Sequence, residues 1–156
     1  MHEKSETLQM NENKFISFTI SGQTFCVDIM AVREIRGWAK PTPIPHSPSY
    51  VCGVINLRGT VLPIVDLGAR LGMPPTDPTP SNVTIVVQIG EQLIGLVVEA
   101  VSDILSLKDS ILQPTPEIAS ETSKAFFKSL VALEGNMIRV IDLSTLAPAP
   151  QMSTAA

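Results

Sequence analysis

Apolar and polar side chains alternate along much of this 156-residue chain, which is the pattern of β-strands that bury one face. The clearest case is the segment VCGVINLRGTVLPIVDL at residues 51–67. We interpret it as two short strands joined by a tight turn at Arg58-Gly59, because glycine readily takes the positive φ that such a turn needs. Pro63 has no N–H for a strand ladder, so the second strand is expected at a sheet edge or with a bulge.

The same alternation predicts further strands, and short stretches of threefold spacing predict helices. Asp28 is suited to cap a short helix in which Ile29, Val32 and Ile35 recur, with Glu34 at its end. Residues 98–105 mirror this segment, and Asp66 is suited to cap a helical turn at 67–72. Strands are expected at 14–20, 24–29, 83–89 and 92–97, and a second hairpin at 126–143.

An internal repeat relates the two halves of the chain. Gly59 recurs as Gly135 and Asp66 as Asp142, both 76 residues later (135 − 59 and 142 − 66). Two copies of about sixty residues are each too small to bury a good core alone, so we expect them to share one. The predicted divisions are a flexible tail at 1–13, a first barrel unit at 14–72, a Pro-rich linker at 73–82, a second barrel unit at 83–147 and a flexible tail at 148–156.

Composition narrows the classes of partner. A formal net charge of −4 argues against nucleic acid and anionic membrane, since both repel a negative protein. The chain shows no signal-peptide pattern and no apolar run long enough to span a membrane, which predicts a cytoplasmic protein. Cys26 and Cys52 both lie in apolar strand-like segments and are expected to be buried thiols.

Few residues carry candidate chemistry. No His/Cys cluster and no Gly-rich phosphate loop is present in the sequence, so neither a metal nor another cofactor is expected. The repeated Asp66 and Asp142 allow the alternative of an aspartic-protease-like hydrolase. Leu67 and Leu143 follow them, where that enzyme class needs a hydroxyl residue, so we interpret both aspartates as helix caps.

Two charges break the symmetry of the repeat. Arg58 is replaced by Glu134 in the second copy, and Glu34 by Asp103. Arg58 is either a solvated surface group or one half of a forked ion pair with Glu34 or with a partner's carboxylate. Because the chain offers apolar strand edges and little chemistry, this balance favours a protein-binding module over an enzyme, with a self-associating regulatory module as an alternative.

Several segments together resemble a known family. The segments VREIRG, VCGVINLRGTVLPIVDLGARLG, IGLVVEAVSDILSL and IRVIDLSTL are similar to CheW, the bacterial chemotaxis adaptor family, over residues 15–146. The resemblance implies a mainly β fold of two Src-homology-3-like five-stranded barrels with short helices, packed around a shared hydrophobic core. It implies no catalytic activity, and residues 14–147 together would form one CheW-like domain.

The resemblance also implies partners and contact residues. The chain is expected to couple chemoreceptor cytoplasmic tips to the regulatory domain of a CheA-type histidine kinase in arrays at the membrane, without inserting into it. The family's receptor-binding groove between the barrels maps onto Val32, Glu34, Gly53, Arg58, Gly59 and Val101. The kinase-binding face is placed around Thr42, Ile44 and His46 in the Pro-rich loop.

Overall fold

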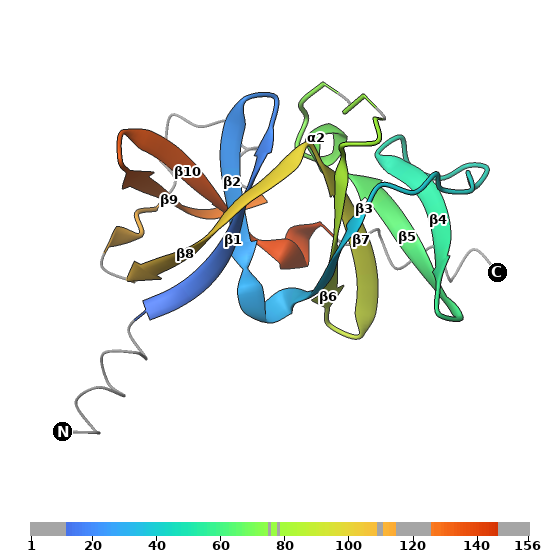
Figure 1. Ribbon diagram of the computed structural model, residues 1–156, viewed down its shortest axis with the longest axis horizontal. Helices are drawn as coiled ribbons and strands as arrows, with labels where there is room; N and C mark the ends of the chain where they lie inside the picture. The colour runs from blue at the N-terminus through green and yellow to red at the C-terminus, as the bar shows by residue number, and fades with distance from the viewer. Residues whose placement is uncertain (1–11, 75, 78, 109–110, 115–125, 147–156) are drawn as a thin grey trace.

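The computed structural model describes residues 12–74, 76–77, 79–108, 111–114 and 126–146, and in these the chain forms two five-stranded sheets that lie side by side (Figure 1). Sheet A has the order β8-β1-β2-β10-β9 and sheet B the order β3-β6-β7-β5-β4. The strands are β1 (Glu12–Ile20), β2 (Gln23–Asp28), β3 (Val32–Gly37), β4 (Val51–Leu57), β5 (Thr60–Asp66), β6 (Val83–Ile89), β7 (Gln92–Val98), β8 (Ala100–Lys108), β9 (Phe127–Leu133) and β10 (Asn136–Ile141). The helical turns are η1 (Ile29–Ala31), α2 (Leu67–Arg70) and η3 (Leu143–Thr145). The predicted mainly β fold is confirmed. The predicted tails at 1–13 and 148–156 fall almost wholly outside the described residues.

The two halves of the chain exchange hairpins. Sheet A combines β1 and β2 with the last three strands of the second half, and sheet B combines β6 and β7 with the last three strands of the first half. Both sheets are joined across the halves by a parallel pair at equivalent places, Ile64 with Gly95 and Val140 with Cys26. The repeated units at 14–72 and 83–147 therefore do not coincide with the two sheets, since each repeat supplies strands to both.

Two segments predicted as helices are strands. Only Ile29–Ala31 is helical after Asp28, whose side chain accepts a hydrogen bond from the Met30 N–H at 2.8 Å. Residues Val32–Gly37 form β3 and pair with β6, and residues 100–108 form β8 and pair with β1. In a regular strand residues three apart point to opposite faces, but each of these strands has an extra residue in its pairing, between Val32 and Glu34 and between Val101 and Asp103. This bulge brings residues at a spacing of three onto one face, which imitates the pattern of a helix. Glu34 is thus on a strand and not at a helix end.

Pro63 does not lie on an edge strand, because β5 is flanked by β4 and β7. It is tolerated for a local reason. Its partner Val54 directs both backbone groups away from β5, donating to and accepting from Thr42 at 2.9 and 2.8 Å. The ladder with β7 begins only at Ile64, so the missing N–H of Pro63 costs no hydrogen bond.

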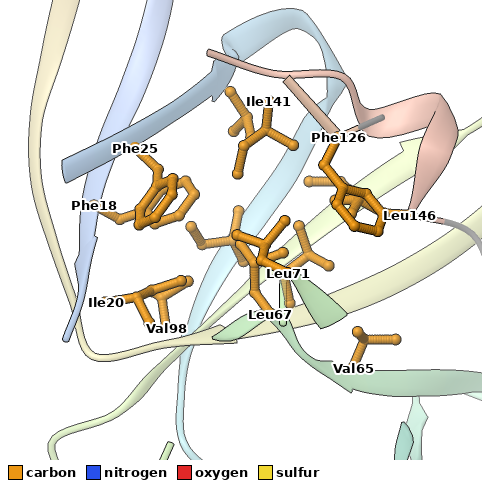
Figure 2. Close-up of a cluster of buried hydrophobic side chains, with 14 of the residues drawn as sticks. Phe18, Ile20, Phe25, Val65, Leu67, Leu71, Val98, Phe126, Ile141 and Leu146 are labelled. Atoms are coloured by element: carbon orange, nitrogen blue, oxygen red, sulfur yellow. The ribbon is translucent and has the colours of Figure 1, made fainter. Parts of the chain in front are cut away.

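Among the residues that the structure describes, buried apolar side chains form three clusters. One lies within sheet A around Phe15 and Val131, and a second lies within sheet B around Leu62 and Val86. The largest lies between the sheets and contains side chains from both, as Figure 2 shows for Phe18, Phe25, Val98, Phe126, Ile141 and Leu146. The expectation of a shared core is confirmed, and the exchange of hairpins explains it.

Arg70 links the two halves at the edge of this core. Its guanidinium lies 4.4 Å from the ring centroid of Tyr50 and 4.9 Å from that of Phe126, which occupy equivalent positions of the repeat. It also donates to the carbonyl of Thr145 at 3.1 Å. A cation between two rings stabilises both contacts, so Arg70 ties α2 to η3.

The two cysteines differ in environment. Cys26 is buried inside sheet A, and burial raises the pKa of its thiol to about 12. Cys52 is exposed, which corrects the expectation that both are buried. Its thiol is still partly covered, and this partial burial, followed by the nearby Asp66 carboxylate, raises the pKa of the Cys52 thiol. It sits where the pairing of β4 with β5 shifts register, between Val51 and Gly53, and this bulge turns it outward.

Gly53 is required by the close approach of the Pro-rich loop to β4. A Cβ atom at this position would lie 2.2 Å from the carbonyl oxygen of Thr42, and its φ of +146° is unfavourable for other residues. Gly37 has open space around it and no such φ.

We expect Gly53→Ala to lower the free energy of unfolding by about 2 kcal/mol or more, because both the loop and the backbone must shift. Gly37→Ala, measured in the same urea titration, should stay within about 0.5 kcal/mol of the wild type. Equal stability of the two variants would contradict the tight fit of the loop.

A thiol reagent should label the native protein at Cys52 and not at Cys26. Cys52 is expected to react slowly and faster as the pH rises, since more of the thiol ionises, whereas Cys26 should react only in denaturant. Mass spectrometry counts the labels, and two labels on the native protein would show that Cys26 is accessible.

Candidate functional site

The most specific polar feature of sheet B is an ion pair between its two edge strands. Arg58 Nη2 lies 3.0 Å from Glu34 Oε1, and Arg58 Nη1 lies 3.4 Å from Glu34 Oε2, so the guanidinium grips the carboxylate as a fork. Glu34 is on β3 and Arg58 follows β4, at opposite ends of the strand order. The sheet therefore curls until its edges meet here. Of the alternatives that the sequence left open for Arg58, the forked pair with Glu34 is the one that the structure contains.

A bulge in β3 turns Glu34 toward this partner. The pairing with β6 shifts register between Val32 and Glu34, so Val32 lies opposite Val87 and Glu34 lies opposite Val86. Val87 belongs to the shared core and Val86 to the cluster inside sheet B. Directly paired residues point to the same face of a sheet. Val32 therefore faces the shared core between the sheets, whereas Glu34 lies on the inner face of the curled sheet B, where its edge strands β3 and β4 meet.

The turn at the other edge holds Arg58 outward. Arg58 and Gly59 have φ values of +50° and +89°, as expected for a two-residue turn of the type that matches strand twist. The Gly59 N–H donates to Asn56 Oδ1 at 2.8 Å, which fixes the turn. The side chain of Arg58 is 71% exposed, against 25% for Glu34.

A second arginine contacts the same carboxylate. Arg36 Nη1 lies 3.2 Å from Glu34 Oε2. The hydrogen bond from Arg58, followed by that from Arg36 and both positive charges, holds the pKa of the Glu34 carboxyl below its usual range. Glu34 is thus ionised at neutral pH. The sequence analysis missed Arg36, although its spacing of two from Glu34 on a strand is the signal for a shared face.

The remaining predicted receptor contacts lie apart from this pair. Val32 and Val101 each lie just after a crossing between the sheets, and both pack against the shared core. Gly53 is buried under the Pro-rich loop. A recess of about 250 Å³ between the sheets is lined by Asp28, Gln88 and Lys128, among others, and by none of the six predicted residues.

The Pro-rich loop that carries Thr42, Ile44 and His46 lies along the β4 edge. Thr42 forms an isolated bridge with Val54, so it protects part of that edge. Ile44 is 40% exposed, and His46 is held at a φ of +63°. A cavity of about 310 Å³ lies beneath the loop, lined by Trp38, Pro43 and Cys52, among others.

Asp66 and Asp142 are helix caps. Asp66 accepts from the N–H groups of Ala69 and Thr76 at 3.3 and 2.9 Å. Asp142 accepts from the N–H of Ser144 at 3.1 Å. Each carboxylate is committed to its own turn, which gives no support to the protease-like alternative.

Two general properties accompany this arrangement. Within residues that the structure describes, no group of three or more His, Cys, Asp or Glu side chains could hold a metal ion. In the same part of the chain no helix combines the length and apolar character needed to cross a membrane.

Comparison with known proteins gives consistent results. The chain is 52% identical over 141 residues to a probable chemotaxis protein CheW of Rhizobium etli, covering 90% of this chain and 91% of that protein. It is 34% identical over 140 residues to the chemotaxis protein CheW of Klebsiella aerogenes, covering 90% and 84%. The fold matches the crystal structure of scaffolding protein TtCheW from Thermoanaerobacter tengcongensis with a TM-score of 0.81 and 29% identity, covering 88% and 89%.

The structural match supports the assignment of the two curled sheets as Src-homology-3-like barrels. The family model of the CheW-like domain matches residues 14–151, which include every strand from β2 to β10 and most of β1. This chain therefore belongs to the CheW-like domain family.

Proposed function

We propose that this chain is a chemotaxis adaptor that couples chemoreceptors to a CheA-type histidine kinase by protein binding alone. Its membership of the CheW-like family supports this function. The observation that assigns this function to a surface is the Glu34–Arg58 pair, which holds an exposed guanidinium in a fixed position. The pair lies where the edge strands β3 and β4 meet, and we call this place the rim of sheet B. Recruitment to receptor arrays at the cytoplasmic face of the membrane follows from such binding.

The proposed receptor surface centres on Arg58 and Gly59 at the turn and Glu34 on β3. An exposed arginine with a preorganised geometry is a typical anchor in protein interfaces. Val32 and Val101, at the crossings between the sheets, and Gly53, beneath the loop, are proposed to shape the surface around it. A receptor tip that presents a helix would bring an apolar and charged face to this rim.

The proposed kinase surface is the Pro-rich loop with Thr42, Ile44 and His46. Ile44 is a large apolar side chain that the fold leaves exposed, although the rest of the loop is anchored by the bridge from Thr42. An exposed apolar residue on an ordered loop is a suitable contact for the kinase regulatory domain.

Arg58→Glu should abolish receptor coupling while the fold is retained. Reversal of the charge repels Glu34 and removes an anchor, and truncation of such anchors costs about 2 kcal/mol or more of binding free energy. The measurement is co-sedimentation with receptor-bearing membranes and the kinase, with kinase activity as the second readout. Thermal unfolding checks the fold.

The double reversal Glu34→Arg with Arg58→Glu is the matched control. It restores a pair of opposite charges at the rim but presents a carboxylate outward, so we expect a stable protein that still fails to bind. If the double variant binds like the wild type, the pair acts only through the fold and Arg58 is not a contact.

Ile44→Glu should impair kinase activation without impairing receptor binding. We expect receptor co-sedimentation to continue while kinase activation falls about tenfold, which corresponds to about 1.4 kcal/mol. Val61→Glu, on β5 and also exposed, serves as a control for the added charge. Normal kinase activation by Ile44→Glu would exclude this part of the loop from the kinase surface.

A further inference from the structure

Three charged side chains at the rim of sheet B carry an excess of one positive charge. Arg36 and Arg58 share a single carboxylate, since Glu34 Oε2 lies 3.2 Å from Arg36 Nη1 and 3.4 Å from Arg58 Nη1. The whole chain has a formal charge of −4, so this rim is positive on a negative protein. Such a local excess attracts a negatively charged group on a partner.

The two arginines are held differently. Arg36 follows Glu34 by two residues on β3 with regular pairing to β6, so the two side chains emerge on the same face. Arg58 reaches Glu34 from the other edge of the sheet, across the closure. Any movement of the β4–β5 hairpin would change the contact of Arg58 with Glu34 and leave that of Arg36 in place.

The exposure of the side chains follows the same division. Arg58 is 71% exposed and Arg36 is 38% exposed. A guanidinium has five N–H groups, and the fork to Glu34 occupies one on each terminal nitrogen of Arg58. The outer N–H groups of Arg58 therefore face solvent and suit a second carboxylate.

Without Arg36, a carboxylate of a partner would approach an ion pair, Glu34 with Arg58, that has no net charge. Glu34 would repel it about as strongly as Arg58 attracted it, and each carboxylate would compete for the same guanidinium. With Arg36 in place, Glu34 keeps a cationic partner while Arg58 is shared. The arrangement thus allows Arg58 to bind outward without leaving Glu34 uncompensated.

We propose that Arg36 is a positioning residue that holds Glu34 while Arg58 binds an aspartate or glutamate side chain of the receptor tip. The inference rests on the proposed function and names the chemistry of the receptor residue that the rim selects. Arg36 itself does not contact the receptor in this arrangement.

The test measures binding of the 156-residue chain to a purified cytoplasmic fragment of a chemoreceptor from the same bacterium. Arg36→Gln should weaken binding about fivefold at low salt, a loss expected for one exposed charge pair, and Arg36→Lys should recover most of it. The ratio between wild type and Arg36→Gln should shrink at high salt, because only an electrostatic role is screened. A structural defect would persist at every salt concentration.

Arg33→Gln is the matched control, with the same loss of charge on the same strand. Arg33 donates to Gln88 and to the carbonyl of Met30, and not to Glu34. Its binding should stay within about twofold of the wild type. If Arg36→Gln binds no worse than Arg33→Gln, the positioning role of Arg36 is excluded.

The receptor residue is found by neutralising each acidic side chain of the fragment in turn. Neutralising one of these acidic residues should weaken binding to the wild-type chain. The same receptor variant should bind Arg58→Gln no more weakly than the unchanged receptor does, as expected when the two residues are coupled partners. If the wild type binds but no acidic residue couples to Arg58, this inference fails and the adaptor function stands. If the wild type does not bind the fragment at all, the proposed function fails first.

Discussion

The exchange of hairpins between the two sheets is the constraint on which the rest of the structure depends. Neither half of the chain holds a complete sheet, because each depends on two strands from the other. The crossings at η1 and between β7 and β8 direct both hairpins over the same apolar cluster. Since strands of both halves bury this cluster together, the two sheets form one cooperative unit.

This constraint determines where binding surfaces can form. The core between the sheets fixes Val98 and Ile141, and Arg70 between Tyr50 and Phe126 ties the two halves at the core's edge. With the framework fixed, the curl of sheet B sets the distance between its edges. The Glu34–Arg58 pair, which joins the two edges, is therefore held in place by packing far from it. Such preorganisation lowers the entropy that would be lost on binding a partner.

Much of this could be predicted from the sequence. Alternation gave most of the strands, and the repeat indicated two equivalent units with a shared core. The forked pair of Glu34 and Arg58 was predicted as one of two options, because an arginine at a hairpin turn is often only a solvated surface group. Two features were not accessible: a six-residue segment at Val32 fits a helix or a strand, and only pairing with β6 decides it. The exchange of hairpins could not be predicted either. The repeated sequence pattern would be the same whether β1–β2 and β6–β7 paired within their own half or with the other half.

The connection at residues 73–82 has a consequence for how the molecule assembles. A single five-stranded half would have to find a second copy to complete its sheets, and its folding would then depend on concentration. Joining the halves in one chain replaces that encounter with an intramolecular one at a high effective concentration. A protein built this way keeps its fold even when only few copies are present, and its two sheets always form in a fixed ratio of one to one.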